Sequence, residues 1–265
     1  MRNIWGVLFY IFIAWNSAYA EDKIIKIAIG DFPPFEYLDN GKVVGINQLT
    51  ISEVFSRIGY KAEFYPFTWK RALSLTESGD MDAIASIQKS SERESKFIFS
   101  NPIMYSQFYL LKKKDKNIEI NSFSDLEKYN VAIIDDYFYG QEFAQANLSN
   151  LAPIASATPD VNNLEKLDKE RVDLVVCSKH VCEYWINKYN NLFSDINYIS
   201  SFPIDPGHML YLAFSKNNLE KSQELVQKFN AELAKYIAEG NIEKNIQNNP
   251  DNKAILVGFD RKKLQ

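Results

Sequence analysis

Two cysteines and two histidines are the side chains of this chain that could support redox or metal chemistry. Cys177 and Cys182 are five positions apart, and a continuous helix would hold their Cα atoms too far apart for a disulfide. A strand end or turn between them would allow the bond, as in many exported proteins, while two buried and reduced thiols are the alternative. Zinc sites need several well-placed ligands, and two cysteines with only His180 and His208 make a poor set. We therefore expect no metal and no cofactor.

Short apolar runs alternate with amphipathic stretches along most of the chain, and these elements must position any site. In the first half we expect strands at residues 24–29, 61–65 and 83–87, with helices at about 47–58 and 69–78 between them. This β-α-β-α-β order requires a parallel sheet covered by helices.

A second α/β set follows without a flexible linker, which favours two lobes joined by strands. We expect strands at residues 108–111, 131–134, 172–177 and 209–214. Helices are expected at residues 140–147, from 158 onward and at 219–240. Ligands of open α/β sheets bind outside the carboxyl ends of the strands. In a two-lobed protein those ends face a cleft, so we expect the site there.

The composition indicates a globular protein and argues against nucleic-acid binding. Hydrophobic residues make up 46% of the 265 residues and charged residues 24%, which suffices for a buried core. The net charge is -4, and Lys and Arg are spread along the chain. Neither a nucleic-acid partner nor attachment to an anionic membrane surface is therefore expected.

The first twenty residues have the pattern of a secretory signal peptide. Arg2 provides a positive start, residues 4–15 are apolar, and Ala18-Tyr19-Ala20 has the small-x-small pattern of a cleavage site. The apolar run is shorter than the roughly 20 residues of a membrane span, although an uncleaved anchor is the alternative. We expect cleavage after Ala20 and a periplasmic mature protein.

Three stretches, in their order and spacing, identify a family. They are GDFPPFE at residues 30–36, GDMDAI at residues 79–84, and Ser91-Glu92-Arg93 followed by FIFSNP at residues 97–102. Together they resemble the extracellular solute-binding protein family 3, the receptors of polar amino-acid ABC transporters. The resemblance covers nearly the whole mature chain.

This resemblance implies an α/β protein with the type II periplasmic-binding-protein fold. Each lobe would be a mixed, mainly parallel sheet flanked by helices, and two strands would form the hinge. Lobe 1 would comprise residues 21–106 and 208–265, and lobe 2 residues 107–207. The implied function is capture of a small polar, amino-acid-like ligand by hinge closure and its delivery to an ABC transporter permease, by a monomer.

The resemblance also assigns roles to residues of the first lobe. Arg93 matches the arginine that holds the ligand α-carboxylate, a role suited to a guanidinium that stays charged; a surface arginine is the alternative. Trp69 and Arg71 resemble an aromatic-x-Arg pair at the cleft, with core packing as the alternative for Trp69. The remaining matches are Phe32, which would pack on the ligand side chain, Ser86, which would contact its carboxylate or amine, and Gln88, which replaces a common small hydroxyl residue.

Two departures from the family pattern concern the second lobe. Ser178 occupies the position at which an Asp usually binds the ligand amine. Asp135, Asp136 and Tyr137 replace the Gly and small hydroxyl residue of an anion-binding helix start. We expect one of these carboxylates to face the cleft and bind a positive group, which predicts a zwitterionic or cationic ligand; helix capping is the alternative.

Two other functions are compatible with this fold. A cleft enzyme similar to cyclohexadienyl or arogenate dehydratases could use Asp31, Asp135 or Asp136 as general acid, which incubation with prephenate or arogenate would reveal. The chain lacks a nucleophile elbow, a phosphate-binding glycine loop and a metal cluster, so we expect no enzyme. A ligand receptor for a chemosensory partner is the other alternative. A single-chain membrane sensor is not expected, because no second apolar segment of about 20 residues is present.

The N-terminal pattern makes a direct prediction. Expressed in a bacterium with an outer membrane, the mature protein should begin at Glu21 and be released by osmotic shock, which N-terminal sequencing of the shock fluid checks. An intact Met1 terminus in the membrane fraction would contradict the assignment.

Overall fold

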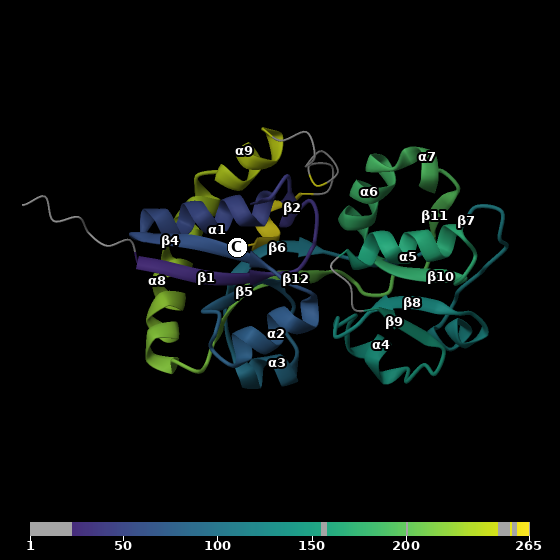
Figure 1. Cartoon of the computed structure of the whole chain (residues 1–265), viewed down its shortest axis with the longest axis horizontal. Coiled ribbons are helices and arrows are strands. Elements are labelled where there is room, and N and C mark those ends of the chain that lie inside the picture. Colours follow the sequence, from purple (N-terminus) through teal and green to yellow (C-terminus); the bar gives the residue numbers. More distant parts are fainter. Residues whose placement is uncertain (1–22, 155–157, 200, 249–254, 256–258, 265) are drawn as a thin grey trace, which may run out of the picture.

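The computed structural model describes residues 23–154, 158–199, 201–248, 255 and 259–264. The expected signal peptide at residues 1–20 lies outside these described residues. The described chain forms two α/β lobes side by side, each built on a five-stranded sheet with helices packed on it (Figure 1). The two-lobed α/β architecture expected from the sequence is confirmed. No helix within the described ranges combines the length and hydropathy of a membrane span.

Lobe 1 combines the first part of the chain with its C-terminal part. Its strands, in spatial order, are β4 (Tyr60–Pro66), β1 (Lys23–Ile29), β5 (Ala83–Ile87), β12 (His208–Ser215) and β6 (Phe97–Ser106). β1 is parallel to β4 and β5, whereas β12 is antiparallel to β5 and β6. All residues of the central strand β5 are buried, which explains why its sequence is an apolar run without polar alternation.

Helices cover both faces of the lobe 1 sheet (Figure 1). They are α1 (Ile46–Arg57), α2 (Trp69–Glu77), α3 (Ser91–Lys96), α8 (Leu219–Ala238), α9 (Asn241–Gln247) and a 3-10 helix (Arg261–Leu264), and a hairpin of β2 (Tyr37–Asp39) and β3 (Lys42–Val44) lies beside them. The long helix α8 buries the apolar face that its periodicity predicts, and the ring centroid of Phe229 lies 5.0 Å from that of Phe55 on α1, with the two rings tilted.

Lobe 2 consists of the middle of the chain. Its strands, in spatial order, are β11 (Ile196–Ile199), β7 (Phe108–Lys113), β10 (Leu174–Ser178), β8 (Val131–Ile134) and β9 (Leu151–Ile154). Its helices are the 3-10 helix Phe123–Lys128, α4 (Gln141–Gln145), α5 (Pro159–Asp168), α6 (Lys179–Lys188) and α7 (Asn190–Phe193). Pro159 opens α5 because the first helical position needs no backbone N–H.

The chain crosses between the two sheets twice, from β6 to β7 and from β11 to β12. Asp205, which precedes β12, holds both crossings together. Its Oδ1 accepts a hydrogen bond from the Phe108 backbone N–H at 2.8 Å, and its carbonyl oxygen accepts one from Gln107 Nε2 at 2.9 Å. We propose that the lobes divide at 106/107 and 207/208, because the hinge strands meet at these contacts.

A disulfide joins Cys177 and Cys182 in lobe 2. Cys177 lies near the end of β10, Cys182 lies in the first turn of α6, and the chain turns from strand to helix at Ser178. This turn holds the two Cα atoms 6.2 Å apart, a separation that a disulfide can span. The bond therefore ties a buried central strand to the helix that covers it.

The disulfide predicts that native, non-reduced protein contains no titratable thiol. Replacing both cysteines by Ala should lower the free energy of unfolding by about 2 kcal/mol, because the bridge closes a short loop in the unfolded chain. Thiol titration under denaturing conditions and urea unfolding measure the two effects. Two reactive thiols after periplasmic expression would show that the bond does not form.

Candidate ligand-binding site

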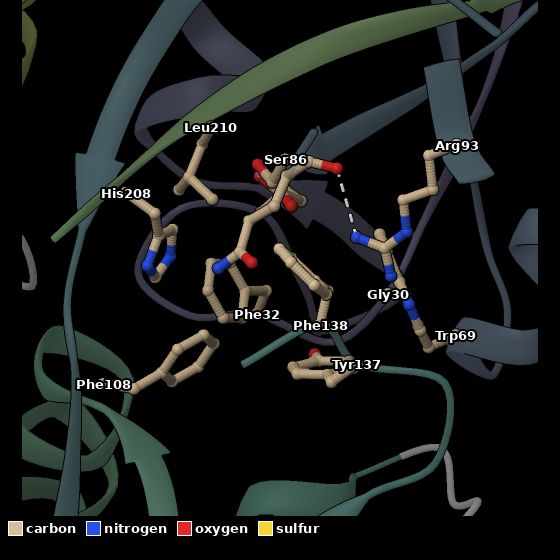
Figure 2. Close-up of a pocket in the computed structure, with 12 residues that line it drawn as sticks. Gly30, Phe32, Trp69, Ser86, Arg93, Phe108, Tyr137, Phe138, His208 and Leu210 are labelled. Carbon is tan, nitrogen blue, oxygen red and sulfur yellow. Dashed lines mark hydrogen bonds between the residues drawn. The ribbon is translucent and has the colours of Figure 1, made fainter. Parts of the chain in front are cut away.

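A cavity lies between the lobes, with about 380 Å³ of non-protein space that includes its solvent-open part (Figure 2). Lobe 1 contributes the segments that follow β1 and β5 and the first turns of α2 and α3, and lobe 2 contributes the segment that follows β8. The site thus lies at the carboxyl ends of parallel strands, as expected for an open α/β sheet. Its lining residues are Gly30, Phe32, Glu36, Trp69, Ser86, Gln88, Arg93, Phe108, Tyr137, Phe138, His208 and Leu210.

Arg93 provides a buried positive charge in the cavity wall. It lies in α3, whose first turn is capped by Ser90, and it is 8% exposed. Its guanidinium donates to the carbonyl oxygens of Gln88 at 3.2 Å and Asp136 at 2.8 Å. Burial lowers the pKa of Arg93 to about 10, so the group is still charged at neutral pH. Among the residues that the structure describes, no carboxylate forms an ion pair with it.

Glu36 is a fully buried carboxyl group that also lines the cavity. Its Oε2 accepts a hydrogen bond from Ser86 Oγ at 2.6 Å, and Ser86 Oγ accepts one from Asn47 Nδ2 at 2.8 Å. Burial raises the pKa of Glu36 to about 8, opposed by the hydrogen bonds from Ser86 and Asn47 and supported by the nearby Asp31 carboxylate. Its Oε1 is buried without a hydrogen-bond partner among the described residues.

The backbone at Ser86 adopts a conformation that suits this network. Its φ of 54° lies in the left-handed region, which non-glycine residues adopt rarely and at an energetic cost. Asp136, across the cleft, has a φ of 60°. Both residues present polar atoms to the cavity charges, because Ser86 Oγ binds Glu36 and the Asp136 carbonyl binds Arg93.

Aromatic rings close the cavity between the lobes. The ring centroid of Tyr137, from lobe 2, lies 5.4 Å from that of Trp69 and 6.5 Å from that of Phe32. Both pairs of rings meet edge to face. Trp69 Nε1 also donates to the Asp136 carbonyl at 3.1 Å. These contacts join the lobes across the cleft and surround the cavity with flat apolar surface.

The carboxylates of Asp135 and Asp136 are not among the residues that line this cavity. Both lie at the rim of the cleft, 3.3 and 3.4 Å from the Nζ of Lys70 on α2. Their side chains are 35% and 42% exposed, and Asp136 reaches Arg93 only through its backbone carbonyl. The neighbouring lysine and solvent therefore satisfy these charges, which the local sequence alone did not reveal.

Two further expected residues lie outside the cavity. Arg71 is exposed on α2, while Trp69 and Lys70 of the same turn face the other lobe. Ser178 is buried, and its Oγ lies 2.6 Å from the Oγ of Ser106. Trp69 and Arg71 are two positions apart on α2 and therefore project to different sides of the helix.

The structure brings the other expected residues together and adds some that sequence reasoning missed. The expected residues that line the cavity are Phe32, Trp69, Ser86, Gln88, Arg93 and Tyr137. Glu36 was missed although it ends the GDFPPFE stretch, where a carboxylate within an apolar motif is a usable signal. His208, Phe108 and Leu210 flank the hinge crossings, and only pairing of the hinge strands brings them to the cavity.

The fold and this site define a two-lobed binding protein with a charged, aromatic cavity between its lobes. Residues 25–249 match the bacterial extracellular solute-binding proteins, family 3. The chain belongs to this family, and the resemblance drawn from its motifs is confirmed.

Individual relatives agree with this membership. The L-cystine-binding protein TcyA of Bacillus subtilis (strain 168) is 25% identical over 243 residues, 87% of this chain and 82% of TcyA. The "Probable amino-acid-binding protein YxeM" of the same organism is 24% identical over 175 residues, 65% of this chain and 66% of YxeM. This second match thus spans just under two thirds of the relative.

Solved structures confirm the type II periplasmic-binding-protein fold. An ancestral arginine-binding protein bound to arginine has a TM-score of 0.73 and 23% identity, with 85% of this chain and 97% of that chain covered. A histidine kinase sensor domain with similarity to periplasmic binding proteins has a TM-score of 0.75 and 21% identity, with 84% and 94% covered. Binding proteins and a sensor domain therefore share this architecture.

Proposed function

We propose that this chain is an exported, monomeric binding protein that captures a small zwitterionic or cationic amino acid between its lobes and delivers it to an ABC transporter permease. The observation that carries the proposal is Arg93, a buried guanidinium without an ion-pair partner among the described residues. A ligand carboxylate supplies the missing negative charge and matches the fork of the guanidinium. The names of the relatives TcyA and YxeM support an amino-acid ligand.

The ligand amine is assigned to Glu36 in this proposal. Ser178 carries no charge, and the Asp135 and Asp136 carboxylates already pair with Lys70. Glu36 lines the cavity with an unpaired Oε1, and an ammonium group would both bind that oxygen and stabilise the carboxylate form. The charged ends of an amino acid would then face Arg93 and Glu36, with Phe32, Trp69 and Tyr137 packing on its apolar atoms.

Binding, rather than catalysis, is what the relatives support, since TcyA and YxeM are named as binding proteins. Closure of the two lobes around the ligand gives a permease a shape that differs from the empty protein. The contacts of Tyr137 and Asp136 with lobe 1 are the interactions that closure would make and opening would break. A periplasmic location after cleavage at Ala20 belongs to this proposal.

The carboxylate anchor is tested with Arg93→Ala. Loss of one partner of a buried charge pair should weaken amino-acid binding by about 2 to 5 kcal/mol, measured by titration calorimetry. Arg71→Ala removes an exposed arginine from the neighbouring helix and should leave affinity unchanged. Wild-type affinity in a folded Arg93→Ala protein would refute the assignment.

Proton release tests the amine site. Because the pKa of Glu36 is about 8 without ligand, the group is mostly protonated at pH 7, and an ammonium ligand that lowers this pKa should release about one proton. Affinity should therefore rise with pH up to about 8 and level off above it. The nearby Asp31, whose pKa burial raises to about 6, also titrates in part of this range, so the assignment needs a variant.

Calorimetry at pH 7 in buffers of different ionisation enthalpy measures the released protons. Glu36→Gln should abolish the release and weaken amine-bearing ligands more than their deaminated analogues. Asp135→Asn serves as the control, since that carboxylate is partly exposed and paired with Lys70. Undiminished proton release from Glu36→Gln would assign the titration to another group.

A further inference from the structure

His208 is held rigidly at the wall of the cavity where the second hinge crossing enters β12. Its ring stacks on Phe108, with 4.7 Å between ring centroids and 27° between planes. Its Nδ1 forms a hydrogen bond with Asp205 Oδ2, while Asp205 Oδ1 accepts from the Phe108 backbone N–H. Figure 2 shows the imidazole between Leu210 and Phe108, facing the cavity. The hinge thus fixes both the position and the plane of this ring.

The hydrogen bond to Asp205 also determines whether the other ring nitrogen, Nε2, donates or accepts a hydrogen bond. An aspartate that accepts a backbone N–H with one oxygen acts as an acceptor, so Nδ1 of His208 carries the proton. In the neutral imidazole, Nε2 is then a hydrogen-bond acceptor. Nε2 is buried without a hydrogen-bond partner among the described residues. A buried acceptor without a donor is destabilising, and in a cavity wall it indicates a ligand group.

A second cavity continues beyond His208. It comprises about 810 Å³ of non-protein space, including its solvent-open part, and shares Gln88, Phe138 and His208 with the first cavity. Its other walls come from the hinge segment before β12, the start of α4, and Lys89 and Tyr211. These three shared side chains form the partition between the two spaces. Arg93 lines the first cavity together with all three of these side chains, so a ligand anchored at Arg93 lies on the same side of the partition.

We propose that His208 selects the ligand side chain by accepting a hydrogen bond from a terminal N–H group. The ligand class is an amino acid with an extended side chain that ends in an amide or guanidinium, and its tail points to the partition formed by Gln88, Phe138 and His208. This inference rests on the proposed function, because it takes Arg93 as the anchor of the α-carboxylate. Asp205 is a positioning residue, since it presents Nε2 as acceptor and does not itself contact the ligand.

Because Nε2 of His208 is buried, it would discriminate between ligands with apolar side chains and ligands with amide side chains. An apolar tail of similar length fills the same space but leaves the nitrogen without a donor, whereas an amide tail satisfies it. Leaving one buried acceptor unpaired corresponds to a loss of affinity of about 10-fold or more. Glutamine and methionine make a suitable ligand pair, because they have similar length and differ in the terminal donor.

The test compares glutamine, arginine, methionine and alanine by titration calorimetry. The wild-type protein should bind glutamine or arginine about 10-fold or more tightly than methionine. His208→Leu should remove that preference while alanine binding is unchanged. His208→Gln, which restores an acceptor oxygen, should recover part of the preference. Thermal unfolding of each variant shows whether it is folded.

His180→Leu is the matched control. His180 is also buried, with Nδ1 unpaired among the described residues, but it packs on Phe35 and lies outside the cavity lining. Its replacement should leave the preference between glutamine and methionine intact. A wild-type protein that binds both equally, or a folded His208→Leu protein that keeps the preference, overturns the inference about His208. Absence of binding for all four ligands would instead contradict the proposed function.

Discussion

The cavity depends on a guanidinium that is removed from water without an ion-pair partner in the described chain. Such a charge is tolerated only where acceptors replace its hydration. Arg93 obtains them from two backbone carbonyls, one in its own lobe at Gln88 and one across the cleft at Asp136. The second carbonyl is available only when the lobes are in contact. The same bond that stabilises the buried charge therefore also stabilises the closed arrangement, and a bound carboxylate would add to both effects.

Asp205 connects the hinge crossings with the wall of the cavity. Asp205 binds the Phe108 backbone, the Gln107 side chain and the His208 ring, so a single residue connects both interlobe crossings with the cavity wall. Rotation of the lobes about these crossings must move against this set of contacts. A ligand side chain that binds His208 would therefore contact the segment that links the two lobes.

Buried carboxyl groups with raised pKa values occur in both lobes. Burial raises the pKa of Glu36 in lobe 1 and of Asp160 in lobe 2 to about 8, and that of Asp31 in lobe 1 to about 6, and each of these shifts includes repulsion or attraction from neighbouring charges. An additional anion near these groups would be unfavourable, while a cation would favour their ionised forms. Arg93 and Glu36 both line the cavity, so an ammonium group that favours the ionised form of Glu36 would leave the cavity with one positive and one negative group, which suits a zwitterion.

The sequence alone determined the lobes, most strands and helices, and the family, because these follow from apolar periodicity and from ordered motifs such as GDFPPFE and Ser91-Glu92-Arg93. It also stated the condition under which Cys177 and Cys182 can bond. Only the tertiary structure decided which charges face the cavity. Lys70 lies 65 positions before Asp135 and neutralises it, and His208 reaches the cavity because β12 pairs with strands distant in the chain. Partners of a buried charge are set by three-dimensional packing, and the local pattern of residues does not record them.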